Sequence, residues 1–317
     1  ADLAAVEALR VKYLGRNGLV QDIMNGLRTA DPAVKREIGQ RANAFKEAVQ
    51  AAVDARREDL QARSSSSAAA FDLTLPGVWR GMGTRHPVTQ IIERATDIFR
   101  GLGFSVASGP DIEDVFHNFE ALNTPEQHPS RDPKDTFYLD DGRLLRTHTS
   151  PVQIRVMESR PPPVRIIAPG RCYRRDTTDA THSANFHQVE GLYVDRQVSL
   201  ADLKGDLTYF ARQMMGPGVK IRFRPHFFPF TEPSVEYDFS CHVCGGKGCR
   251  VCKNSGWIEI SGAGMVNPNV FAAVGYNPDE VTGYAFGMGV ERIAMILLGI
   301  PDIRMLYDND VRFLRQF

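Results

Sequence analysis

The sequence predicts an α+β fold in which helices flank a mostly antiparallel sheet. Strand-like runs follow one another as hairpins between helical segments, an order typical of antiparallel sheets. Neither GxGxxG after a leading strand nor GxxxxGK[ST] occurs, which excludes Rossmann and P-loop folds. With 317 residues, 43% of them hydrophobic, the chain can bury a substantial core.

Charge and cysteine content narrow the functional class. Lys plus Arg equals Asp plus Glu at 38 each, so any surface for nucleic acid must be local. No run of about 18 apolar residues occurs, so no membrane span is expected. The start of the chain lacks a signal-peptide pattern. Four of the five cysteines are clustered, which favours a metal site in a reducing compartment. These features predict a cytoplasmic protein.

Residues 1–63 are expected to form a helical coiled-coil arm. Apolar residues form a stripe over residues 1–14, and Pro32 is well placed at the start of a long helix ending at Arg63. Apolar spacings of four and seven in this helix predict an antiparallel hairpin. Its outer face carries cations interleaved with acids: Arg36, Arg41, Lys46, Arg56, Arg57 and Arg63. Such a face is most often only solvated.

Residues 64–85, which open with SSSSAAA, read as a linker, and a second domain is expected over 86–317. Its expected helices are His86–Gly103 and, opened by the capping-box pattern Ser199–Asp202, a helix that ends near Met215. Its expected strands are Phe104–Ala107, a hairpin across 135–146, Ile221–Arg224, Trp257–Met265 and Tyr284–Phe286. The last strand leads through two glycines into a helix with Arg292.

A charged hairpin over 169–195 is the centre of this domain. Its first arm carries arginines, including Arg174, whose planar guanidinium suits a phosphate. Its second arm alternates, so that Gln188 and Glu190 share a face suited to an ammonium group. The alternative is a solvated hairpin with surface charges.

Two CxxC pairs within residues 241–252 form the clearest chemical motif. Cys241, Cys244, Cys249 and Cys252 have spacings suited to a tetrahedral zinc ion. Four thiolates would close the coordination shell, so the zinc is expected to be structural. The alternatives are a redox pair or an iron centre.

Several motifs resemble those of class II aminoacyl-tRNA synthetases. GFSVASGPDIE (103–113) resembles motif 1, the 169–195 hairpin resembles motif 2, and GYAFGMGVERIAM (283–295) resembles motif 3. THTSPVQ (147–153) and FFPFTEPS (227–234) narrow the resemblance to the alpha subunits of bacterial phenylalanyl-tRNA synthetases, over nearly the whole chain.

The resemblance implies activation of phenylalanine with ATP and transfer to tRNA. It implies contacts to ATP from Arg174, Asp176, His182, Phe186 and Arg292, with Arg174 at the α-phosphate, Arg292 at the γ-phosphate and Phe186 stacked on adenine. It implies contacts to phenylalanine from His148, Ser150, Gln153, Gln188, Glu190, Phe228, Phe230, Ala285 and Gly287. Arg174, Arg292 and His148 are expected to be the catalytic groups. His148 and Ser150 are expected on one face of a strand.

The resemblance also implies partners and a second metal. Glu232 would bind Mg²⁺ together with a beta subunit, in an assembly of two alpha and two beta chains. The arm 1–63 would contact tRNA(Phe), and editing would belong to the beta subunit. Tyr138 and Asn267 depart from the residues that the family usually shows, Trp and His.

Three other functions remain open from the sequence. The first is a class II synthetase for another amino acid, which the set Phe228, Phe230 and Ala285 disfavours. The second is a synthetase-like regulatory or RNA-binding module with an inactive site. The third, a zinc-binding nucleic-acid module, would explain only the cysteines.

Overall fold

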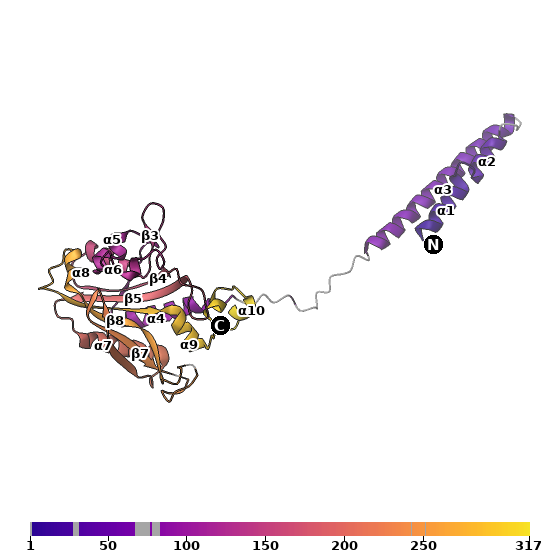
Figure 1. Cartoon of the computed structure of the whole chain (residues 1–317). Coiled ribbons are helices and arrows are strands. Elements are labelled where there is room, and N and C mark those ends of the chain that lie inside the picture. Colours follow the sequence, from indigo (N-terminus) through magenta and orange to yellow (C-terminus); the bar gives the residue numbers. More distant parts are fainter. Residues whose placement is uncertain (1, 28–31, 67–76, 78–82, 242, 251) are drawn as a thin grey trace. The chain divides into compact units, whose positions relative to one another are not determined.

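A computed structural model describes residues 2–27, 32–66, 77, 83–241, 243–250 and 252–317. The chain forms two compact units, Ala1–Gly81 and Met82–Phe317 (Figure 1). Among the described residues, no helix is both long enough and apolar enough to cross a membrane.

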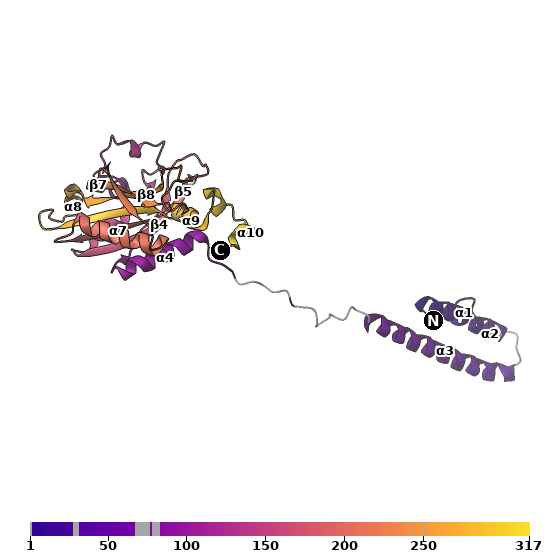
Figure 2. The ribbon, with the colours of Figure 1, turned by 90° about the horizontal axis from the view of Figure 1, so that it is seen from below.

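The N-terminal unit is a helical hairpin. The long helix α3 (Pro32–Ser66) lies alongside α1 (Leu3–Leu14) and α2 (Leu19–Gly26) (Figure 2). Its narrow seam buries Val6, Val20 and Ala42, which explains why the apolar stripe in the sequence is sparse. Helix α3 extends to Ser66, and most of the predicted linker, residues 67–76 and 78–82, lies outside the described residues.

The C-terminal unit is built on a seven-stranded sheet of order β1-β4-β5-β9-β8-β7-β6. Among the strands of the described residues, only the β1–β4 pair is parallel. The strands are β1 Ser105–Val106, β4 Val164–Tyr173, β5 Asn185–Asp195, β9 Thr282–Gly289, β8 Trp257–Val266, β7 Thr231–Ser240 and β6 Ile221–Phe228. A separate pair joins β2 (Ile112–Glu113) to β3 (Leu144–Leu145). The predicted α+β class is confirmed.

Helices cover both faces of this sheet (Figure 1). One face packs against α4 (Pro87–Gly101), α7 (Leu200–Met215) and α9 (Val290–Leu298). The rings of Phe210 and Phe286 each stack on the Phe99 ring at a centroid distance of 4.9 Å, so aromatic packing joins this layer to the sheet. The other face carries α5 Val115–Asn118, α6 Ser150–Ser159, α8 Pro268–Ala273 and the short helix η1 Glu120–Leu122. The remaining short helices are η2 Pro129–Arg131, η3 Ile303–Leu306 and α10 Val311–Leu314.

Local sequence signals place some elements correctly and one incorrectly. The capping box at Ser199 forms with both reciprocal hydrogen bonds to Asp202, and α7 ends at Met215 as expected. The strand expected to carry His148 and Ser150 is wrong, because Thr149 caps a helix that begins at Ser150. Pro151 sits in the first turn of that helix, where no N–H is required. Ser150 and Gln153 therefore project from a helix end rather than from a strand face.

Candidate active site

A cavity of about 160 Å³ lies between helix α6 and the strands β5, β8 and β9. All the residues expected to contact phenylalanine line it, and so does Arg174. These are His148, Ser150, Gln153, Gln188, Glu190, Phe228, Phe230, Ala285 and Gly287. An apolar cavity of about 150 Å³ is large enough to hold benzene, so this volume suits one aromatic side chain.

Glu190 is the buried charge at the polar end of the cavity. Its carboxylate accepts hydrogen bonds from the Thr149 backbone N–H (3.2 Å), the Ser150 hydroxyl (2.6 Å) and the Gln153 amide (3.0 Å). Burial raises the pKa of Glu190 to about 7, although Ser150 and Thr149 counteract that shift by hydrogen bonding to the ionised form. The first turn of α6 thus orients a carboxylate that can ionise near neutral pH.

His148 supplies a neutral polar group to the same wall. Burial, together with the charges of Arg174 and Arg146, lowers the pKa of His148 to about 3. The imidazole is therefore uncharged at neutral pH. Its Nδ1 atom is buried without a hydrogen-bond partner in the described part of the chain. Because buried polar atoms are normally paired, this nitrogen is suited to a ligand.

Aromatic rings close the apolar end of the cavity. Phe228 and Phe230 stack at 5.7 Å with an interplanar angle of 12°. The Phe228 ring lies over Gly262, where an added Cβ would come within 2.4 Å of the ring. Ala285 faces the same space from β9. Close approach of this ring therefore favours glycine at position 262, which no motif in the sequence indicated.

The residues expected to bind ATP lie at the mouth of the motif 2 hairpin and on α9. Arg174 follows β4 directly, donates to the Thr147 carbonyl at 3.2 Å and lies 5.0 Å from the Phe186 ring centroid. Arg292 is exposed in the first turn of α9, where the helix dipole adds positive charge. Within the described residues, it makes no ion pair with a carboxylate. Arg174 thus lies beside an aromatic ring, and the exposed guanidinium of Arg292 lies at a helix N-terminus, where an anionic ligand is favoured.

Asp176 and His182 lie outside the cavity. Both are exposed in the loop between β4 and β5, and the His182 backbone N–H donates to the Asp179 carboxylate at 2.7 Å. Among the described residues, no hydrogen bond or ion pair joins either of them to Arg174 or Phe186. Their expected role in ATP binding stays a prediction.

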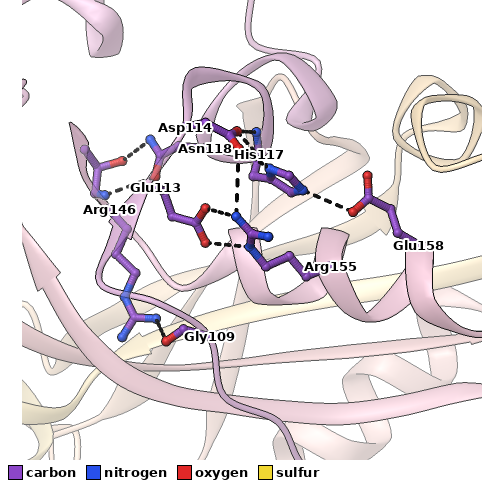
Figure 3. A network of polar contacts seen from close by, with 9 residues as sticks. Gly109, Glu113, Asp114, His117, Asn118, Arg146, Arg155 and Glu158 are labelled. Carbon is purple, nitrogen blue, oxygen red and sulfur yellow. Dashed lines mark hydrogen bonds and ion pairs between the residues drawn. The ribbon is translucent and has the colours of Figure 1, made fainter. Parts of the chain in front are cut away.

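A polar network fixes the segment that carries His148 (Figure 3). Arg146 is buried and donates to the carbonyls of Arg171 (2.7 Å) and Gly109 (3.2 Å). Asn118 binds Thr147 twice, since its amide donates to the Thr147 hydroxyl (3.1 Å) and its carbonyl accepts from the Thr147 N–H (3.2 Å). Hydrogen bonds to Arg171, Gly109 and Asn118 thereby hold the backbone that leads to His148.

The same network anchors helix α6 (Figure 3). Arg155 pairs with the buried Glu113 through two hydrogen bonds of 2.9 and 2.5 Å. One turn further, Glu158 accepts from His117 at 3.1 Å, and His117 also binds Asp114 at 2.8 Å. Helix α6 is therefore tied to β2 and α5, which places Ser150 and Gln153 relative to Glu190.

Glu232 lies in a wider groove beside the cavity. It is exposed on β7, and the Asn267 amide lies 3.5 Å from its carboxylate. Tyr138 does not line the cavity; its hydroxyl donates to the Arg131 carbonyl at 3.0 Å. Tyr138, which stands where the family usually shows Trp, is therefore not part of the cavity wall.

The four clustered cysteines converge at the far end of β7 and β8. The Sγ–Sγ distances are 3.8 Å for Cys241–Cys249, 3.9 Å for Cys244–Cys252 and 3.8 Å for Cys249–Cys252. None of these four described cysteines takes part in a disulfide. Cys172, in contrast, is buried alone in β4, and burial raises the pKa of its thiol. The nucleophilic thiolate form of Cys172 is therefore disfavoured.

Some site residues were not anticipated from the sequence. Thr149 and Arg146 hold Glu190 and the His148 segment, and Glu291 binds His187 beside Phe186. Arg146 directly precedes THTSPVQ and Glu291 directly precedes Arg292, so position next to a motif was the available signal.

The sequences of both units are similar to those of known proteins. Residues 70–317 match the family described as "tRNA synthetases class II core domain (F)", and residues 1–68 match "Aminoacyl tRNA synthetase class II, N-terminal domain". The phenylalanine–tRNA ligase alpha subunit of Pelobacter propionicus is 55% identical, covering 99% of this chain and 93% of the relative. That of Moorella thermoacetica is 54% identical, covering 98% and 93%. Pyrrolysyl-tRNA synthetase from Desulfitobacterium hafniense shares the fold, with a TM-score of 0.54, 15% identity, and coverage of 82% of this chain and 84% of that one.

Fold and motif order therefore define a class II aminoacyl-tRNA synthetase. Within that class, the chain belongs to the family of phenylalanine–tRNA ligase alpha subunits.

Proposed function

We propose that this chain is the catalytic subunit that activates L-phenylalanine with ATP and transfers it to tRNA(Phe). The single observation that carries this proposal is the cavity, which joins a buried carboxylate, Glu190, to an aromatic wall in a volume suited to a benzyl group. Glu190 can bind the ammonium group, while Phe228 and Phe230 contact the ring.

In the proposed reaction, a carboxylate oxygen of phenylalanine attacks the α-phosphorus of ATP. The new O–P bond gives phenylalanyl-adenylate, and the bond to the leaving pyrophosphate breaks. Both reactants are anions, so catalysis consists mainly of charge neutralisation and in-line positioning. Arg174 would bind the α-phosphate and Arg292 the γ-phosphate, with adenine stacked on Phe186. Asp176 and His182 are assigned weaker contacts to ATP from the loop.

The phenylalanine contacts divide by chemistry. Glu190 would bind the ammonium group, assisted by Ser150 and Gln188. His148 would meet the carboxylate as a neutral hydrogen-bond partner, because its low pKa keeps it uncharged. Gln153 would fix Glu190, whereas Ala285 and Gly287 leave room for the ring.

Mg²⁺ would neutralise phosphate charge when ATP is bound. Glu232 is the residue proposed to hold it, together with a group of the partner subunit. Mg²⁺ takes few protein carboxylates and keeps several waters, so one exposed Glu beside an amide fits this role.

We also propose a structural zinc ion at Cys241, Cys244, Cys249 and Cys252. Tetrahedral zinc–thiolate bonds of about 2.3 Å require Sγ–Sγ distances of roughly 3.8 Å. The three close Sγ pairs support this fit. Metal analysis should give one zinc per chain, lost in Cys244→Ser. Iron, or a disulfide in place of metal, would contradict the proposal.

The proposed assembly contains two alpha and two beta subunits in the cytoplasm. The N-terminal arm, residues 1–63, is proposed to contact tRNA(Phe) through its cationic outer face. The names of the relatives support a beta partner and a tRNA substrate.

ATP–pyrophosphate exchange with each of the twenty amino acids tests the proposed function. We expect exchange with phenylalanine, from the alpha chain co-purified with its beta partner, and loss of exchange in Arg174→Ala. Exchange with a different amino acid would indicate a sister synthetase. Absence of exchange from a folded, assembled protein would favour the regulatory module.

A further inference from the structure

Three donors converge on the buried carboxylate of Glu291, outside the phenylalanine cavity. Glu291 lies in the first turn of α9 and is 2% exposed. It accepts from the His187 backbone N–H (2.9 and 3.0 Å), from His187 Nδ1 (2.7 Å) and from the Tyr307 hydroxyl (2.6 Å). A buried carboxylate requires such partners, and because it only accepts, His187 Nδ1 carries the proton.

Strand topology explains why a side chain is needed at this position. Strand β5 pairs with β9 from Gln188–Gly289 onward, and β9 ends at Gly289. At His187 the neighbouring chain has already turned into α9, so the His187 N–H has no strand acceptor on that side. The Glu291 carboxylate supplies the acceptor. The hydrogen bond from His187 to this carboxylate extends the pairing of β5 by one residue beyond its last pair with β9. The extended pairing ends next to the residue that precedes His187 in the strand.

The neighbours of these residues are the groups assigned to ATP. Phe186 precedes His187 on β5, and Arg292 follows Glu291 on α9. The hydrogen bonds between His187 and Glu291 therefore set the position of the aromatic platform relative to the helix that carries Arg292. Glu190, by contrast, is held by the first turn of α6.

The segment that follows α9 reinforces this link. Tyr307 comes directly after η3, whose Ile303 N–H donates to the Ala180 carbonyl in the motif 2 loop at 2.9 Å. Leu306 in the same helix accepts from His86 Nε2 at 2.8 Å, at the start of α4. One short segment thus contacts the start of helix α4, the motif 2 loop and the motif 3 helix.

We propose that Glu291, His187 and Tyr307 form a positioning cluster for ATP, which holds Phe186 in register with Arg292. The inference rests on the proposed function for the assignment of these two groups to ATP. It predicts that damage to the cluster weakens ATP binding and leaves phenylalanine binding nearly intact. A cluster that only stabilised the fold would affect both substrates together.

Tyr307→Phe is the decisive variant, because it removes one hydroxyl and keeps the ring. Glu291→Ala would leave the buried His187 N–H unpaired and can prevent folding. Tyr276→Phe is the matched control, since it removes a hydroxyl that donates to the Arg160 carbonyl at 2.5 Å outside the cavity. Each protein is co-purified with its beta partner. ATP affinity is measured by calorimetry, and both KM values are measured by pyrophosphate exchange.

We expect Tyr307→Phe to weaken ATP binding about tenfold, as for loss of one hydrogen bond to a charged group. Its KM for phenylalanine should stay within about twofold of the original, and Tyr276→Phe should change neither value. Unchanged ATP affinity, or equal increases in both KM values, would overturn the positioning role. Failure of the unaltered protein to exchange with phenylalanine would instead reject the proposed function, while the calorimetric comparison would still decide the role of the cluster.

Discussion

Glu190 makes phenylalanine binding dependent on pH at the scale of a single residue. Its pKa in the fold is about 7, above the ordinary value of about 4.3 for a glutamate. At pH 6 only about a tenth of Glu190 remains ionised, so attraction for the ammonium group is largely lost. We expect the KM for phenylalanine to rise about tenfold from pH 8 to pH 6, measured by pyrophosphate exchange.

Rising pH has opposite effects on the stability that Glu190 contributes and on phenylalanine binding by Glu190. Because folding raises this pKa, the favourable contribution of Glu190 to stability is complete below its unfolded pKa and is lost as pH rises through about 7.

The variant Glu190→Gln tests the effect on binding. Because glutamine does not ionise, the variant should raise the KM for phenylalanine at pH 8 and remove the dependence of this KM on pH. A KM that still rises toward pH 6 in this variant would assign the titration to another group.

Gly262 is the second residue whose change should affect one substrate selectively. A Cβ at this position would approach the Phe228 ring to 2.4 Å, so this ring, which lines the cavity, would have to shift. We expect Gly262→Ala to raise the KM for phenylalanine at least about tenfold, equivalent to about 1.4 kcal/mol, with little change for ATP. Gly101→Ala is the control, because a Cβ there meets nothing within 4 Å. Equal KM values in the two variants would show that Phe228 moves away from the cavity.

Site residues could be predicted from the sequence only where they belong to a recognisable motif. The residues expected around phenylalanine do gather at one cavity, although their individual roles remain predictions. The link between His187 and Glu291 could not be predicted, because it joins positions 104 residues apart and depends on where β9 ends. Close approach, as at Gly262, leaves no pattern in a single sequence.

At the scale of elements, local signals succeeded where they acted within a few residues. The capping box of α7 is an example, since both of its partners lie within one turn. The segment 147–153 failed because its polar alternation resembles a strand, whereas Thr149 and Pro151 begin a helix. Tertiary contacts from Asn118 and Arg146 then fix its position.

The two partners of the ion pair that attaches α6, Arg155 and Glu113, should contribute unequally to the free energy of unfolding. Glu113 is fully buried, whereas the Arg155 side chain is 37% exposed, so losing the arginine leaves a buried charge and losing the acid does not. We expect Arg155→Met to lower the free energy of unfolding by about 3 kcal/mol and Glu113→Gln by about 1 kcal/mol. Urea unfolding of both variants measures the difference. Equal losses would mean that solvent reaches Glu113 when its partner is removed.

At the scale of the whole molecule, the division into an arm and a catalytic domain was expected from composition. The seam of α1, α2 and α3 is narrow because few apolar residues face it, and the second unit has a separate and larger core. Because the two units have separate cores, we expect amino-acid activation and tRNA binding to be separable along the same division.

Removal of residues 1–66, which takes away the arm and the whole of helix α3, should separate amino-acid activation from tRNA binding. The cavity and the groups assigned to ATP all belong to the unit Met82–Phe317, so amino-acid activation needs no side chain from the arm. Cations on α3, including the exposed Arg36 and Lys46, would be lost together with their attraction for phosphate. Pyrophosphate exchange should stay within about twofold, and the KM for tRNA(Phe) in aminoacylation should rise at least about tenfold. In the intact protein that KM should also rise with salt, and a salt-independent KM or unchanged charging by the shortened chain would remove the arm from tRNA binding.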